Sequence, residues 1–198
     1  MRKIVAAAIV LLATNQTGMA ETCEETFARL LVHGNGEGPV RIHIVQEVKG
    51  GQTSTNEFLM VNDGHWMTRM IDPASGWYLT YDNVMYQSQD EGKSWTKVRD
   101  VDSAGDKAAS IRNLEENATT TANAVCGEED LDGAMHDTVE ADFDTLQAFK
   151  THNHYKYWVD RQSGLIVKAT YETRGEGFES FTTQTPVPAP DLTLPVPD

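Results

Sequence analysis

The sequence predicts an α+β domain, in which one strongly curved antiparallel sheet of about ten strands has helices on its concave face. Three observations indicate this class. Short segments rich in strand-forming residues alternate with turn signals along most of the chain, which favours antiparallel hairpins. Two segments, one near residue 25 and one after residue 102, show helical spacing instead. The second of these separates an early group of strands from a later group.

The first twenty residues are typical of a secretory signal peptide. Arg2 and Lys3 give a charged start, residues 4–13 form an apolar run, and Gly18–Ala20 is a small-x-small exit. The run is too short to span a bilayer. We therefore expect cleavage after Ala20 and a periplasmic or secreted protein without stable membrane insertion.

Charge and cysteine content narrow the possible partners. Cleavage would take the formal net charge from −14 to −16, and so acidic a surface repels nucleic acid, which excludes it as a partner. In an exported protein the two cysteines, Cys23 and Cys126, predict one disulfide. Two free buried thiols are the alternative. No cofactor is predicted.

A short helix opens the mature chain. Thr22 and Glu25 predict a capping box, Phe27 and Leu30 follow at helical spacing, and Gly34 ends the helix. From residue 40 the apolar period changes to two, which indicates a strand. Five more strand segments follow between tight turns, at residues 53–61, 65–71, 77–81, 84–88 and 93–98.

Helical spacing returns after residue 102 and predicts a helix over 103–125 with a small-residue stripe, formed by Ala104, Ala108, Ile111, Ala118, Ala122 and Val125. The Thr119–Thr121 run lowers helix propensity, so we expect the far end to fray or bend. Strands resume at 138–143, 154–160, 165–171 and 178–183. We expect one domain over 21–185 and an extended, mobile, proline-rich tail over 186–198.

Residues 88–95 match the Asp-box pattern S-x-D-x-G-x-[ST]-W of sialidase-type propellers. One copy cannot build a propeller, which needs several four-stranded blades. We interpret it as a structural hairpin, in which Asp90 caps the turn, Gly92 takes a positive φ and Trp95 packs underneath.

Two acidic patterns raise the question of a metal. Residues 128–133 resemble half of a calcium loop but lack the bidentate acid, and a solvated acidic loop is the alternative. His152 and His154 share a strand face, which Asp142 and Asp144 would join in even register. Surface histidines facing acids explain this pattern equally well. We predict no metal site and no catalytic residue.

Thioethers and aromatic rings are concentrated in the early strands. Together with two apolar residues of the second helix, they predict an apolar ligand cavity lined by Met60, Trp66, Met67, Met70, Trp77, Tyr78, Met85, Ile111 and Leu114. Strand alternation lets only some of these side chains point inward. An ordinary core is the alternative explanation.

Two hairpin motifs then indicate a family. Residues 157–168 read as an aromatic strand, Asp-x-x-[ST]-Gly-Leu and a strand with a basic residue, and residues 86–97 read as a strand, an Asp-Gly turn and Trp. With the order of helices and strands, these motifs resemble the LolA/LolB-like lipoprotein-carrier superfamily. The resemblance implies an incomplete barrel around an apolar cavity that helices cover and acyl chains occupy.

These observations together predict an exported, non-enzymatic binding or carrier protein for a lipid or other apolar ligand in the periplasm. One alternative is a cell-envelope protein-interaction module with a filled core and no ligand. A metal-dependent hydrolase is the second alternative.

Overall fold

A computed structural model describes residues 21–147 and 149–197, so the predicted signal peptide lies outside the described residues. Within these residues the helices are α1 (Cys23–His33) and α2 (Ser103–Ala118). The strands are β1 (Val40–Val48), β2 (Ser54–Asn62), β3 (His65–Asp72), β4 (Trp77–Tyr81), β5 (Val84–Ser88), β6 (Thr96–Asp100), β7 (Ala122–Leu131), β8 (Ala134–Asp144), β9 (Thr151–Val159), β10 (Ile166–Gly175) and β11 (Phe178–Pro188).

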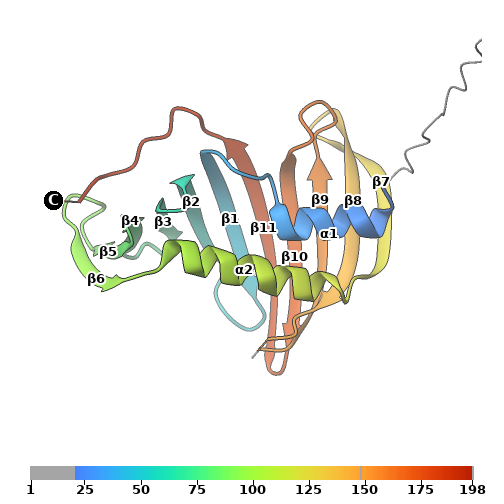
Figure 1. Cartoon of the computed structure of the whole chain (residues 1–198), viewed down its shortest axis with the longest axis horizontal. Coiled ribbons are helices and arrows are strands. Elements are labelled where there is room, and N and C mark those ends of the chain that lie inside the picture. The colour runs from blue at the N-terminus through green and yellow to red at the C-terminus, as the bar shows by residue number, and fades with distance from the viewer. Residues whose placement is uncertain (1–20, 148, 198) are drawn as a thin grey trace, which may run out of the picture.

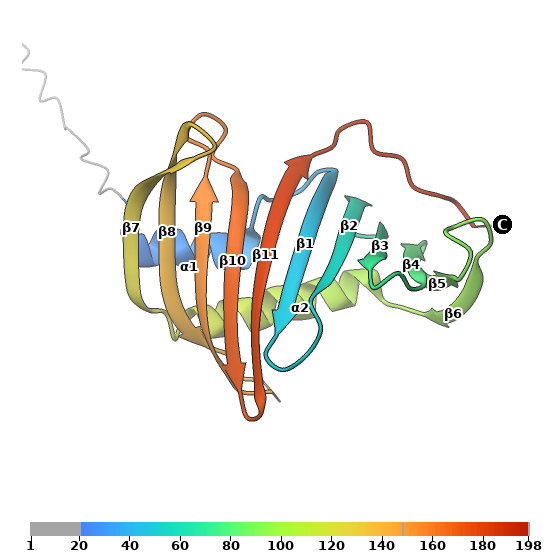
Figure 2. The ribbon, with the colours of Figure 1, turned by 180° about the vertical axis from the view of Figure 1, so that it is seen from behind.

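All eleven strands form one open antiparallel sheet in the order β6-β5-β4-β3-β2-β1-β11-β10-β9-β8-β7. The sheet curves around both helices, which lie on its concave face (Figures 1 and 2). This confirms the predicted α+β class with a curved, open sheet. β11 pairs with β1 on one side and β10 on the other, and thereby joins β1–β6 to β7–β10.

Helix α1 begins and ends as the sequence predicts. Thr22 and Glu25 form a reciprocal capping box, and Gly34 takes a φ of 52° while its N–H donates to the Leu30 carbonyl. The helix buries Phe27 and two leucines against β8, β9 and β10. This apolar contact holds α1 in place, because a helix of this length is marginal alone.

A disulfide joins Cys23, the first residue of α1, to Cys126 on β7. It connects the helix to one edge of the sheet, since β7 has a single strand neighbour. Such a bridge is typical of an oxidising compartment.

Helix α2 is shorter than predicted, because residues 122–125 belong to β7 instead. After Ala118, Thr119, Thr120 and Thr121 turn their hydroxyls back and donate to the carbonyls of residues 116, 117 and 118. These local bonds compete with continued helix. The prediction of a helix over 103–125 is therefore wrong over residues 119–125, beginning at the position where a bend was expected.

The convex face carries a second apolar cluster around Leu59, Met67 and Leu79. The Asp-box hairpin packs over it: Asp90 accepts from the N–H and hydroxyl of Ser94, and Trp95 lies against the cluster. Gly92 has a φ of 83°, as predicted. The hairpin is therefore structural.

The proline-rich end of the chain also covers this cluster. β11 continues to Pro188, beyond the expected domain boundary at residue 185. Leu192 and Leu194 then pack against the convex cluster, and His65 Nε2 lies 3.0 Å from the Pro195 carbonyl oxygen. Mobility of the tail stays a prediction.

Neither described helix combines the length and the apolar character that a bilayer crossing requires.

Candidate functional site

The two halves of the concave face are covered differently. Over β8–β10, α1 fills the space with a continuous core that includes Phe27, Val139 and Tyr157. Helix α2 packs against α1 and β8 with its C-terminal half. Its N-terminal half extends over the other half of the sheet (Figure 1), where α1 does not reach.

A hollow of about 580 Å³ lies between that half of α2 and the concave face of β2–β6. We call it the α2 groove. It is lined by Val32, Phe58, Met60, Asp63, Trp66, Thr80, Met85, Arg99, Val101, Ser103, Asp106, Lys107, Ser110, Ile111 and Leu114. Its volume is within the range of small-molecule sites.

Two further hollows adjoin the α2 groove. One of about 560 Å³ shares Met60, Ile111 and Lys107 with it. The other, of about 420 Å³, lies under residues 34–39 and also reaches Met60. All three hollows have Met60 in their lining, so they lie side by side along the concave face, and we refer to them together as the channel.

The Asn35 side chain helps to hold the loop over 34–39 above this channel. The Asn35 amide donates to the Ile166 carbonyl at 2.9 Å, and its oxygen accepts from the Ile166 N–H at 2.6 Å. An asparagine side chain thus imitates a strand neighbour at the start of β10, and the loop remains over the channel.

The register of the sheet explains which predicted cavity residues meet. Val40 pairs with Met60, Met60 with Trp66, Trp66 with Thr80, and Thr80 with Met85, so these side chains share the concave face. Ile111 and Leu114 face them from α2. Five of the nine predicted residues therefore line the α2 groove: Met60, Trp66, Met85, Ile111 and Leu114.

The other four lie elsewhere. Met67 is 4% exposed in the convex cluster, against which Trp77 also packs. Tyr78 is on the concave face but exposed, with its hydroxyl accepting from Gln87. Met70 lies next to Trp77 in a separate surface hollow near the end of β3.

Several lining residues were missed by sequence reasoning. Phe58 stands two residues before Met60, so the same strand alternation signals its position. Val32 belongs to the last turn of α1, and Arg99 and Thr80 are polar residues on the concave face. Thr80 and Arg99 belong to no apolar pattern, so only the sheet register places them in the groove.

An ionic contact lies at the rim where the three hollows adjoin. Lys107 Nζ on α2 lies 2.7 Å from Asp63 in the β2–β3 turn and 3.3 Å from Glu37 in the loop over 34–39. Hydrogen bonding to Asp63, and then to Glu37, raises the pKa of Lys107. One cation therefore ties three segments together at the rim.

The histidine–acid pattern forms in even register, as the sequence allows. His154 Nδ1 lies 2.8 Å from Asp142, and His152 Nδ1 lies 2.9 Å from Asp144, all on the convex face. Hydrogen bonds from Asn123 and then His154 lower the pKa of Asp142. Among the described residues, no group of three His, Cys, Asp or Glu side chains is placed to hold a metal.

The acidic run at 128–133 forms the end of the β7–β8 hairpin. Asp132 and Gly133 take positive φ values, and Asp130 accepts from the Gly133 N–H at 3.0 Å. This turn, which Asp130 caps, accounts for the acidic pattern of residues 128–133.

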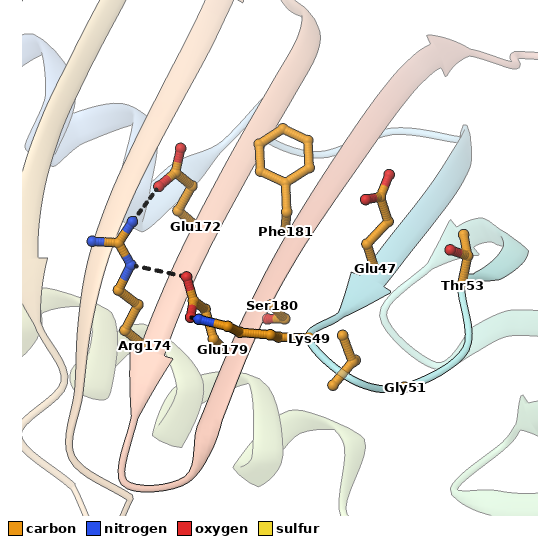
Figure 3. A pocket seen from close by; sticks show the side chains of 10 residues that line it. Glu47, Lys49, Gly51, Thr53, Glu172, Arg174, Glu179, Ser180 and Phe181 are labelled. Carbon is orange, nitrogen blue, oxygen red and sulfur yellow. Dashed lines mark hydrogen bonds and ion pairs between the residues drawn. The ribbon is translucent and has the colours of Figure 1, made fainter.

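The convex face has a different hollow, of about 480 Å³, between the ends of β1, β10 and β11 (Figure 3). Phe181 stands at its centre, and Arg174 bridges Glu172 and Glu179 beside it. Lys49 pairs with Glu179 as well. The cations of this hollow are thus paired with its own acids, and its lining is mixed rather than apolar.

No protein-family model and no curated protein matches the sequence. A solved structure of the Pseudomonas aeruginosa MucA/MucB complex contains a chain that is 16% identical, with a TM-score of 0.45 over 85% of this chain and 58% of that one. This chain therefore spans under two thirds of the length of that match.

Two further solved structures are similar. A LolA superfamily protein from Nitrosomonas europaea is 9% identical, with a TM-score of 0.37 over 88% of this chain and 96% of that one. A putative outer membrane lipoprotein-sorting protein domain from Vibrio parahaemolyticus is 11% identical, with a TM-score of 0.34 over 86% and 92%. The similarity concerns the fold alone, so any ligand has to be inferred from this chain's own channel.

Proposed function

We propose that this protein is a non-enzymatic binding or carrier protein for a lipid or another apolar ligand in the periplasm. The observation that carries the proposal is the uneven cover of the concave face, filled by α1 on one side and hollow under α2 on the other. If this region were a packed core, Met60, Trp66 and Ile111 would not surround an open space, because protein interiors are close-packed.

The channel has the size and chemistry for an acyl chain. Each buried methylene contributes about 0.8 kcal/mol, so a long chain reaches micromolar affinity after the costs of association. A filled-core interaction module, the alternative function, predicts no space beneath α2. The single disulfide is consistent with work outside the cytoplasm.

The proposal is tested by filling the groove from α2. Ser110 and Ala108 are both exposed residues of α2, but only Ser110 lines the α2 groove. We expect Ser110→Trp to weaken binding of a fluorescent fatty acid at least tenfold. Ala108→Trp is the matched control, since it adds the same ring to the same helix and should leave binding unchanged.

Two results would contradict the proposal. One is a wild-type protein, purified and stripped of bound lipid, that never binds the probe. The other is equal binding by both tryptophan variants at unchanged thermal stability. Native mass spectrometry of the protein from its own host would identify the bound molecule, and the intact mass should place the mature N-terminus at Glu21.

A further inference from the structure

Two buried hydroxyl groups in the α2 groove have no hydrogen-bond partner. Among the described residues these are Thr80 Oγ1 and Ser103 Oγ, and both residues line the groove. Thr80 is 1% exposed. A buried hydroxyl left unpaired is costly, and native proteins have few of them. Two such groups beside one cavity indicate a polar partner that occupies it.

An arginine stands beside these hydroxyls. Thr80 pairs with Met85 and Met85 with Arg99, so all three side chains share the concave face of adjacent strands. Two strand spacings separate Thr80 from Arg99, roughly 10 Å between their Cα atoms, which the long arginine side chain can span. Within the described part of the chain, the ion pairs do not include Arg99. Ser103 follows β6 at the start of α2.

The groove is therefore polar at one end and apolar at the other. Arg99, Thr80 and Ser103 gather where β4, β5 and β6 meet the start of α2. Toward the channel's other arms the lining becomes Phe58, Met60 and further apolar residues. A ligand that matches both ends is an amphiphile with a polar head and one apolar chain.

We propose that the ligand is an acyl chain carrying an anionic oxygen head group, such as a carboxylate, and that this head lies at Arg99, Thr80 and Ser103. This inference rests on the proposed function and names the ligand class of the same site. The guanidinium and the two hydroxyls donate hydrogen bonds to the head group. Arginine suits this role because its fixed fork matches a carboxylate, and charge-assisted hydrogen bonds are the stronger kind. The nearby Lys107 is already paired with Asp63 and Glu37.

One acid at the same end opposes the head group. Asp106 lines the α2 groove, and its carboxylate would repel an anion there. The assignment therefore predicts opposite effects of two substitutions on the affinity. Removing the charge of Arg99 should weaken binding of the anionic ligand, and Asp106→Asn should tighten it. If the site were purely apolar, both substitutions would leave the affinity for the ligand unchanged.

The test compares palmitic acid with hexadecanol, which share the chain and differ in the head group. Competition against a fluorescent fatty acid, in the full oxidised protein, should show the wild type preferring the acid by about tenfold. Arg99→Gln should reduce this preference toward one. Arg112→Gln is the matched control, because Arg112 is an exposed arginine of α2 outside the groove.

A second variant addresses the buried hydroxyl directly. Thr80→Val keeps the shape of the side chain and removes its unpaired hydroxyl, so it should raise the Tm of the ligand-free protein while lowering the affinity for palmitate. Thr68→Val, on the same face of the neighbouring strand β3 but outside the α2 groove, should change neither.

The outcomes separate this inference from the proposed function. Equal affinities for acid and alcohol in the wild type, or equal behaviour of Arg99→Gln and Arg112→Gln, would overturn the head-group assignment while leaving apolar binding intact. Binding of neither compound would overturn both. A Tm of Thr80→Val below that of the wild type would show that the hydroxyl is not an unpaired group.

Discussion

Replacing Phe27 with alanine tests the contrast between the filled and hollow halves of the concave face. The Phe27 ring is fully buried, with its centroid 5.6 Å from that of Tyr157 and 6.1 Å from that of Phe143. Its loss removes apolar contacts and leaves a cavity under α1. Substitutions of this kind cost about 3–5 kcal/mol.

The matched change in the hollow half is Ile111→Ala. Ile111 is half-buried and already borders open space, so its truncation creates no new cavity and should cost about 1 kcal/mol. In a domain of this size each kcal/mol shifts the Tm by about 2–4 °C. We expect Phe27→Ala to lower the Tm by roughly 6–20 °C and Ile111→Ala by roughly 2–4 °C.

Urea denaturation of the oxidised proteins, followed by circular dichroism, measures both free energies of unfolding. Losses of equal size would show that the space beneath α2 is packed as densely as the core beneath α1. That result would refute the distinction on which the binding site depends.

Replacing Cys23 and Cys126 together by serine opens a loop of sequence separation 103 and should cost about 4–5 kcal/mol, measured by denaturation with and without reductant. The hydrogen bond from Asn123 is the main cause of the lowered pKa of Asp142. The ionised carboxylate therefore stabilises the folded protein above the ordinary pKa of 3.8, and this stabilisation is lost as the pH falls through the pKa of the folded state. Asp142→Asn should therefore reduce the fall of Tm at acid pH, measured as a pH–Tm curve. Lys107→Met removes both ion pairs at the rim of the channel, so it should speed the release of a fluorescent fatty acid, measured by stopped flow, with little change in Tm. An unchanged release rate would show that these ion pairs do not retain the ligand.

The sequence predicted those features well whose pattern depends only on hydrogen bonds between residues close in the chain. The capping box of α1 and the Asp-box turn depend on local hydrogen bonds, and both form as expected. β7 was missed because it is an exposed edge strand, and its run through Glu128 and Glu129 has no apolar alternation to reveal it. Only pairing with β8 makes it a strand.

The candidate site was predictable in part for a different reason. Both faces of β3 are apolar, since Trp66 faces the α2 groove and Met67 faces the convex cluster. Nothing local distinguishes the two faces. The convex one is covered by the distant Leu192 and Leu194, a contact that no sequence periodicity can anticipate.

The position of β11 has a consequence for how the molecule assembles. Among the described strands, β11 comes last in the sequence and lies between β1 and β10, so β1 cannot gain this neighbour until residues up to 188 have been synthesised. Pairings between Val40 and Pro188 or Val45 and Thr183 are among the longest-range contacts a chain of this length can make, and such contacts slow folding. Until β11 arrives, β1 and β10 are two open edges available to other chains. A truncation before residue 178 would leave two unjoined sheets rather than a slightly smaller protein.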